Sequence, residues 1–204
     1  MTTTLDRVRE LNYDHHRRMT ELHEQRVATG VNGEIANIDE QSYRALLAPV
    51  PQCQQILELG SASGGQWPLL EQWLRDSGEI WGIDLYEPLV TQAQQRGLKI
   101  ALGFVEDMNM YPDNAFDLVC SRHVMEHLGD LERGVAEILR VTRPGGYIAQ
   151  VTPNMAFDPE PAHLNALDAA GWRAVWEATG AVTIIEVMRH EFHGGEVHVV
   201  VQKR

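Results

Sequence analysis

The sequence predicts an α/β protein built on a doubly wound, mostly parallel sheet of seven strands, and three observations favour this fold class. Short apolar runs alternate with helical patterns through five successive units of the chain. The first run, Ile56–Leu59, leads into a loop of small residues, Gly60–Gly65, which opens a helix. The last two runs, Val182–Met188 and Val197–Gln202, are close enough in sequence to form an antiparallel hairpin joined at Gly194–Gly195. In such a sheet we expect ligands at the carboxyl ends of the strands, where the strand order reverses.

The elements between these landmarks follow from apolar spacing and from capping residues. Asp130 and Asp168 precede two of the helical patterns and are typical N-caps, while Pro144 and Gly180 can stop the helices that follow. The remaining expected strands are Ile80–Asp84, Leu98–Val105, Phe116–Ser121 and Tyr147–Val151, and the expected helices run from Trp67 to Leu74, Glu87 to Gly97, Leu131 to Thr142 and Asp168 to Ala178.

The first quarter of the chain has a different pattern. Apolar residues recur at helical spacing from Thr3 to about Val27, and Thr29–Gly33 breaks this amphipathic helix. A second short helix is expected from Asp39 to Leu47, before Pro49 and Pro51. We therefore predict a single domain over residues 1–204, with an N-terminal helical cap (1–52) and an α/β core (53–204).

Composition limits the classes of partner. The 204 residues carry a formal net charge of -12 without any run of Lys and Arg, which argues against nucleic acid or an anionic membrane as the partner. Cys53 and Cys120 form no closely spaced pair, so we expect two reduced thiols. The sequence shows neither a basic segment followed by an apolar one at the N-terminus nor an apolar stretch of membrane-spanning length, and we expect a cytoplasmic protein.

Acidic residues follow three of the expected strands. Asp84 lies about twenty residues beyond the glycine turn, the usual distance for a carboxylate that accepts hydrogen bonds from ribose hydroxyls. NAD and S-adenosylmethionine both need such a group, but Glu58 beside the loop would repel a pyrophosphate and could help to hold a cationic amine. Asp107, next to Glu106, could accept from an adenine amino group or orient the neighbouring backbone. The acids therefore favour S-adenosylmethionine.

On these residues the sequence resembles the class I S-adenosylmethionine-dependent methyltransferases, especially the small-molecule group related to the ubiquinone/menaquinone methyltransferases. The resemblance runs from about Gln55 to the C-terminus and implies a Rossmann-like core. It departs from the family at Ala62, where a glycine is usual, and in Glu106–Met110, which is about one residue short. The similar blocks are Ile56–Gly64, Trp81–Asp84, Tyr111–Val119, Ser121–Leu128 and Leu139–Gly146.

The acids and the resemblance together define an expected cofactor site and reaction. We expect S-adenosylmethionine to be converted into S-adenosylhomocysteine, with Asp107 rather than Glu106 facing the adenine. In-line transfer from a sulfonium neutralises a cation and mainly requires alignment in a desolvated pocket, so no metal is expected. The helical cap resembles the lids of small-molecule methyltransferases, and we expect a small-molecule acceptor. The expected cofactor-binding residues are Glu58, Gly60, Ser61, Ala62, Gly64, Asp84, Leu85, Glu106, Asp107, Met108 and Ser121.

His163 and His123 are the two candidates for a general base. An oxygen or acidic carbon acceptor must lose a proton near the time of transfer, and imidazole titrates close to neutral pH. His123 follows the fourth strand and His163 the fifth, so both should lie at the carboxyl edge of the sheet. Each could instead pack or hydrogen-bond in the pocket wall.

Two other functions fit parts of the sequence. The segment His123-Val124-Met125-Glu126-His127 matches an inverted zinc-protease pattern, which would make the protein a zinc-dependent hydrolase that uses His123, Glu126 and His127. The fold could also serve a non-catalytic S-adenosylmethionine-binding or scaffolding module. Formation of S-adenosylhomocysteine would separate a methyltransferase from such a module.

Overall fold

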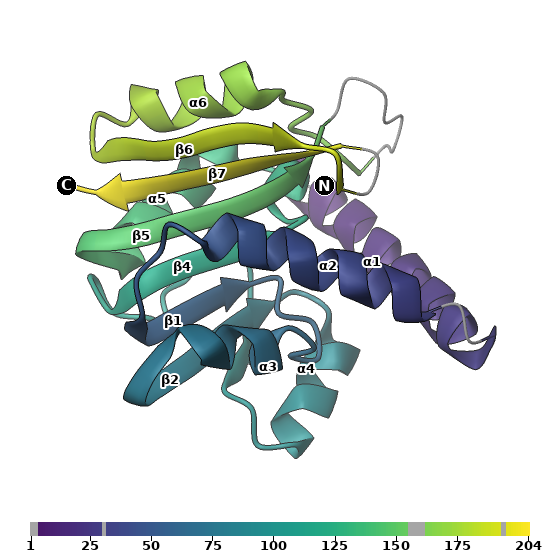
Figure 1. Cartoon of the computed structure of the whole chain (residues 1–204). Coiled ribbons are helices and arrows are strands. Elements are labelled where there is room, and N and C mark those ends of the chain that lie inside the picture. Colours follow the sequence, from purple (N-terminus) through teal and green to yellow (C-terminus); the bar gives the residue numbers. More distant parts are fainter. Residues whose placement is uncertain (1–3, 30–31, 155–161, 193–194) are drawn as a thin grey trace.

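A computed structural model describes residues 4–29, 32–154, 162–192 and 195–204 and confirms the predicted fold class (Figure 1). The seven strands form one sheet in the order β3-β2-β1-β4-β5-β7-β6. Strands β1 to β5 pair in parallel, whereas β7 lies antiparallel between β5 and β6, as the expected hairpin requires. The strands are β1 (Cys53–Leu59), β2 (Leu74–Asp84), β3 (Ile100–Leu102), β4 (Phe116–Arg122), β5 (Thr142–Pro153), β6 (Val182–His190) and β7 (Glu196–Lys203).

Helices cover both faces of the sheet, and two apolar cores lie between the layers. Alternate residues of β1 point to opposite faces, so Leu57 packs in the core under α5 and α6, which includes Trp172, while Ile56 packs in the core with Tyr43. Asp130 and Asp168 accept hydrogen bonds from backbone N–H groups of α5 and α6, which confirms both predicted N-caps. The helices are α1 (Thr4–Thr29), α2 (Asn32–Leu47), α3 (Trp67–Leu70), η1 (Glu71–Trp73), α4 (Glu87–Gln95), η2 (Met125–His127), α5 (Leu131–Val141) and α6 (Ala169–Ala178).

Several boundaries differ from the prediction. The helix expected from Trp67 to Leu74 is limited to α3 and η1, because Leu74 already pairs with Cys53 at the start of a long β2. The strand expected over Leu98–Val105 keeps only β3, because Gly103 turns away and donates to the carbonyl of Asp84.

The cap and the loops also differ in part. Helix α2 begins at Asn32 instead of Asp39, and the break expected at Thr29–Gly33 includes residues 30–31, which lie outside the described part of the chain. The turn expected at Gly194–Gly195 is likewise only partly described. No helix in the described ranges has the length and apolar character that crossing a membrane requires.

The reversal of strand order lies between β1 and β4, beside the glycine loop. Figure 1 shows α1 (purple) along the edge of the sheet where β1 and β5 end. The fold therefore brings the N-terminal helix to the edge at which doubly wound sheets bind their ligands.

Candidate active site

Gly60 opens the loop after β1 in a conformation that only glycine adopts readily. Its φ is +66°, and its N–H donates to the carbonyl of Ile83 at 2.8 Å. A Cβ at this position would lie 2.4 Å from Cγ2 of Val124. The missing side chain therefore lets the loop pass directly against the segment that follows β4.

Asp84 joins the end of β2 to the same loop. Its Oδ2 accepts a hydrogen bond from the N–H of Ala62 at 2.8 Å, and its Oδ1 accepts from the N–H of Tyr86 at 2.8 Å. Ala62 has a φ of +46°, a region that favours glycine, so the methyl group of Ala62 makes this loop conformation strained. The carboxylate is 3% exposed and has a fixed orientation.

A small cavity, here called the edge cavity, lies between this loop and α1. Its volume is about 40 Å³, because Arg9 and Asn12 of α1 close one side of it. The guanidinium of Arg9 stacks over the ring of Phe104 at 4.1 Å, and Asn12 donates to the carbonyl of His127 at 2.7 Å. The lining residues are Val8, Arg9, Asn12, Gly60, Leu85, Gly103, Phe104, Val105, Glu106, Val124, His127 and Leu128.

Three of the predicted cofactor residues, Gly60, Leu85 and Glu106, line this cavity. Others lie in the adjoining loop and strand end without lining it, namely Ser61, Ala62, Gly64 and Asp84. Met108 and Ser121 are buried and are not among the lining residues. Sequence reasoning missed Arg9 and Asn12, because no pattern in α1 indicates which of its residues lie over the loop. It also missed Phe104, which lies in a turn after β3 instead of in the strand expected there.

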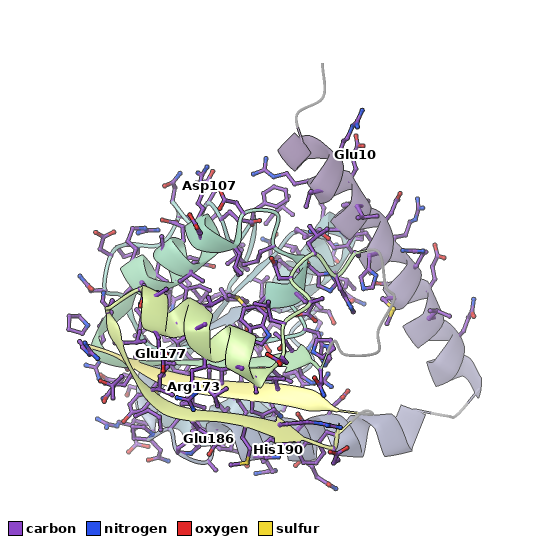
Figure 2. All side chains as sticks on the ribbon, turned by 90° about the horizontal axis from the view of Figure 1, so that it is seen from above. Glu10, Asp107, Arg173, Glu177, Glu186 and His190 are labelled. Carbon is purple, nitrogen blue, oxygen red and sulfur yellow. The ribbon has the colours of Figure 1, made fainter. Side chains whose placement is uncertain are left out.

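The structure places Glu106 in the cavity rather than Asp107. Glu106 is 7% exposed, and its Oε1 accepts from the N–H of Gly129 at 3.0 Å. Asp107 instead accepts from Asn109 and points outward from its turn (Figure 2). Glu106 therefore lines the edge cavity and Asp107 does not, and the expectation that Asp107 faces the adenine stays a prediction.

Glu58 lies behind the loop and does not line the edge cavity. Its two carboxyl oxygens accept from the hydroxyl of Tyr43 at 3.3 Å and from Nε1 of Trp67 at 3.0 Å. Burial raises the pKa of Glu58 to about 8, although both hydrogen bonds oppose the rise. At neutral pH the group is therefore largely protonated, and its contacts hold α2 and α3 against β1.

His123 lies between two buried carboxylates. Its Nδ1 is 3.3 Å from Oε1 of Glu126, and its Nε2 is 3.2 Å from Oε1 of Glu196, which also contacts Arg122 at 3.1 Å. Burial alone would lower the pKa of His123, but the two carboxylates outweigh it and raise the pKa to about 9. The backbone φ of His123 is +54°, a strained value for a non-glycine residue. A protonated imidazole in this position is a poor general base.

The ring of His163 lies near the rings of two other histidines. Its ring centroid lies 4.7 Å from that of His127 and 6.0 Å from that of His15 on α1. Nδ1 of His127 is 3.0 Å from the carbonyl oxygen of Ala162, and burial lowers the pKa of His127 to about 4. The structure therefore brings His163 next to a residue that lines the edge cavity.

The zinc-hydrolase arrangement of His123, Glu126 and His127 is not assembled. In the described parts of the chain, the set of three or more ligating side chains that converges is His15, His127 and His163. His123 instead pairs with Glu126 and Glu196. The sequence pattern thus identified one residue of a convergent cluster, His127, and its neighbour Glu126, but did not identify His15 and His163.

Comparison with known proteins agrees with this architecture. Residues 57–150 match the family described as a methyltransferase domain. The chain is 30% identical over 171 residues to malonyl-[acyl-carrier protein] O-methyltransferase of Salmonella typhimurium, covering 73% of this chain and 66% of that protein. It is 30% identical over 150 residues to a probable S-adenosylmethionine-dependent methyltransferase of Mycolicibacterium smegmatis, covering 69% and 56%.

A solved structure supports the fold. The N-methyltransferase NodS of Bradyrhizobium japonicum, in complex with S-adenosyl-L-homocysteine, superposes with a TM-score of 0.63 at 18% identity, over 80% of this chain and 84% of that one. The chain spans less than two thirds of the length of the two curated relatives. By its domain match and its relatives, this chain contains an S-adenosylmethionine-dependent methyltransferase domain.

Proposed function

We propose that this protein transfers a methyl group from S-adenosylmethionine to a small-molecule acceptor. The observation that carries the proposal is the hydrogen bond of 2.8 Å between the N–H of Ala62 and Oδ2 of Asp84. It fixes a carboxylate beside the glycine loop, and each carboxylate oxygen still has a further lone pair with which to accept from a ribose hydroxyl. This arrangement suits the adenosyl group that the family uses.

The residues of the chain would contribute alignment and exclusion of water. When bound, S-adenosylmethionine supplies a methyl group on a cationic sulfonium. Apolar side chains of Phe104, Val124 and Leu128 line part of the edge cavity and would limit the access of water to the sulfonium. Since in-line transfer neutralises a charge, orientation in such a pocket is the main requirement, and the proposed transfer step uses no metal.

Of the two histidines expected as a general base, the surroundings favour His163. His123 already carries a proton near neutral pH, because Glu126 and Glu196 raise its pKa to about 9. The ring of His163 packs against His127, which lines the edge cavity. We therefore propose that His163 accepts the proton of an oxygen or carbon acceptor.

A small acceptor is supported by one relative and by the cover that α1 gives the site. Arg9 and Asn12 of α1 line the edge cavity, so the helix lies over this end of the site and limits the approach of a large acceptor. The Salmonella relative is named for methylation of an oxygen on a malonyl group carried by a protein. We propose an oxygen nucleophile of similar size, free or carrier-bound, with neither nucleic acid nor membrane as a partner.

Calorimetry on one matched pair of variants tests the cofactor assignment. Asp84→Asn should weaken binding of S-adenosylmethionine by about 1.5–3 kcal/mol, the usual contribution of a hydrogen bond to a charged group. Asp76→Asn removes a carboxylate from an exposed position of the same strand and should leave affinity unchanged. Equal affinities for the wild type and Asp84→Asn would contradict the ribose assignment.

Release of S-adenosylhomocysteine tests the reaction. Wild-type protein is incubated with S-adenosylmethionine and a panel of hydroxyl, carboxylate, amine and acidic-carbon compounds. We expect turnover with one class of small oxygen nucleophile. Two results would refute this function. One is tight cofactor binding with no turnover on any small compound, free or bound to a carrier protein, and the other is turnover only on nucleic acid or on the side chains of a protein.

A further inference from the structure

Three histidines from distant parts of the sequence converge beside the edge cavity. His15 comes from α1, His127 from η2, and His163 from the segment that follows β5. One ring nitrogen of each lies within 4.8 Å of those of the other two. The ring centroids of His15 and His127 are 4.8 Å apart, and those of His127 and His163 are 4.7 Å apart. We call these three residues the histidine cluster.

The orientation of His127 is fixed in a way that suits metal binding. Its Nδ1 lies 3.0 Å from the carbonyl oxygen of Ala162. Because a carbonyl can only accept, Nδ1 carries the proton and Nε2 has the lone pair. Metal-binding histidines are usually held in this manner, with the second nitrogen donating to a carbonyl or a carboxylate.

A buried carboxylate adjoins the same nitrogen. Oε1 of Glu126 lies 3.9 Å from Nε2 of His127, and the side chain of Glu126 is fully buried. Oε1 of Glu126 also lies 3.3 Å from Nδ1 of His123, and His123 is the one side chain among the described residues that hydrogen-bonds this carboxylate. A buried carboxylate is costly, and a cation on the histidine cluster would lower that cost.

We propose that His15, His127 and His163 bind one divalent transition-metal ion of the zinc type, which fastens α1 to the core beside the edge cavity. Imidazole nitrogens suit zinc, nickel and copper, whereas magnesium and calcium prefer oxygen ligands. Three protein ligands leave a fourth position of the zinc tetrahedron for a water molecule. The role is structural, because the ion joins a helix near the N-terminus to two loops of the α/β core.

The distances require only a small closure. Three atoms no more than 4.8 Å apart can all lie within about 2.8 Å of one central point. Zinc–nitrogen bonds measure about 2.0–2.1 Å, so each nitrogen would move by about 0.7 Å. Rotation about side-chain bonds covers such a shift without a change in the backbone.

Metal binding by the histidine cluster is a second function and does not depend on the proposed methyl transfer. It replaces the sequence-based expectation that the protein has no metal site. The proposed metal also limits the general-base role of His163, because a nitrogen that binds a metal cannot accept a proton. General-base action by His163 would therefore belong to the metal-free protein only.

Metal titration of the full chain, without an affinity tag and after treatment with a chelator, tests the proposal. Zn²⁺ is followed by calorimetry, and Co²⁺ by its visible absorption, which reports tetrahedral nitrogen ligands. We expect one ion per chain, and His15→Ala or His163→Ala should weaken binding by about 100-fold or more, since even changes in outer-shell partners cost about 10–100-fold. His190→Ala, at the end of β6 and outside the cluster, is the matched control and should bind as the wild type does (Figure 2).

Hydrogen–deuterium exchange gives a second readout that requires neither cofactor nor turnover. Zn²⁺ should slow exchange across residues 4–29 in the wild type and in His190→Ala, and should have no effect on His15→Ala. His15 is only half-buried on a helix, so its replacement should preserve the fold, and circular dichroism verifies this. The proposal would be overturned if Zn²⁺ bound to His15→Ala as tightly as to the wild type, or if Zn²⁺ did not change the exchange rate of α1 in the wild type.

Discussion

Burial of Glu58 should make the stability of this protein fall as the pH rises through neutrality. The side chain is 4% exposed, and burial raises its pKa from 4.5 to about 8. Between these two values the native chain keeps a proton that the unfolded chain has released. The stability contributed by protonated Glu58 is therefore fully present below pH 4.5 and is lost as the pH rises through about 8.

Glu58→Gln should remove this loss. Over this interval the free energy of unfolding changes by about 1.4 kcal/mol for each pH unit. From pH 4.5 to about 8 the wild type would therefore lose about 5 kcal/mol of unfolding free energy at most. Relaxation around the ionised group would reduce this amount. The amide oxygen of glutamine can still accept from Nε1 of Trp67, so the variant should match the wild type near pH 5 and exceed it near pH 9.

Urea unfolding from about pH 5 to about pH 9 measures the effect. Glu177→Gln is the control, because this carboxylate is exposed on α6, with Arg173 3.6 Å away (Figure 2), and such surface pairs contribute little. The unfolding free energies of the wild type and of Glu177→Gln should decrease equally as the pH rises. The unfolding free energy of Glu58→Gln should not show this decrease. Parallel curves for the wild type and Glu58→Gln would refute the reasoning.

Two further variants probe the strained positions of the site. Ala62→Gly should raise the unfolding free energy by about 0.5–1 kcal/mol, because the release of strain at a φ of +46° exceeds the added flexibility of the unfolded chain; thermal unfolding measures this, and a lower midpoint would contradict it. His123→Gln should destabilise the protein most below pH 6.5, and less as the pH rises through about 9, where the wild type loses the proton that pairs with Glu126 and Glu196. Urea midpoints at both ends of this range provide the test, and a constant difference between the two proteins would exclude His123 as the titrating group.

Most of the fold could be predicted from the sequence because buried parallel strands leave a strong pattern. Ile56–Leu59 and Phe116–Ser121 are nearly uninterrupted apolar runs, and both are central strands of the sheet. The failures lie where pairing between strands overrides local preference. Leu74 continues a helical pattern in sequence, yet its backbone pairs with Cys53 and begins β2.

The candidate cofactor site could be predicted from the sequence only where a residue is fixed by its place in the fold. Asp84 follows from its distance to the glycine loop, and the structure indeed joins the two. Glu106 and Asp107 occupy a turn, where neighbouring side chains point in different directions and no periodicity tells which is inward. His15, His127 and His163 converge only through the tertiary fold, so their spacing in the sequence carries no signal.

The position of α1 connects the cofactor with the proposed metal. An edge cavity of about 40 Å³ is far smaller than the roughly 300–1,000 Å³ of typical ligand pockets, so a nucleoside can bind only if the side chains of α1 give way. Those side chains are held by the contact of Arg9 with Phe104 and by the hydrogen bond of Asn12 to the carbonyl of His127. An ion on His15 would add to these contacts and would raise the free energy needed to displace the helix. Because linkage is reciprocal, a metal that fastens α1 and a cofactor that displaces it must weaken each other's binding by the same factor.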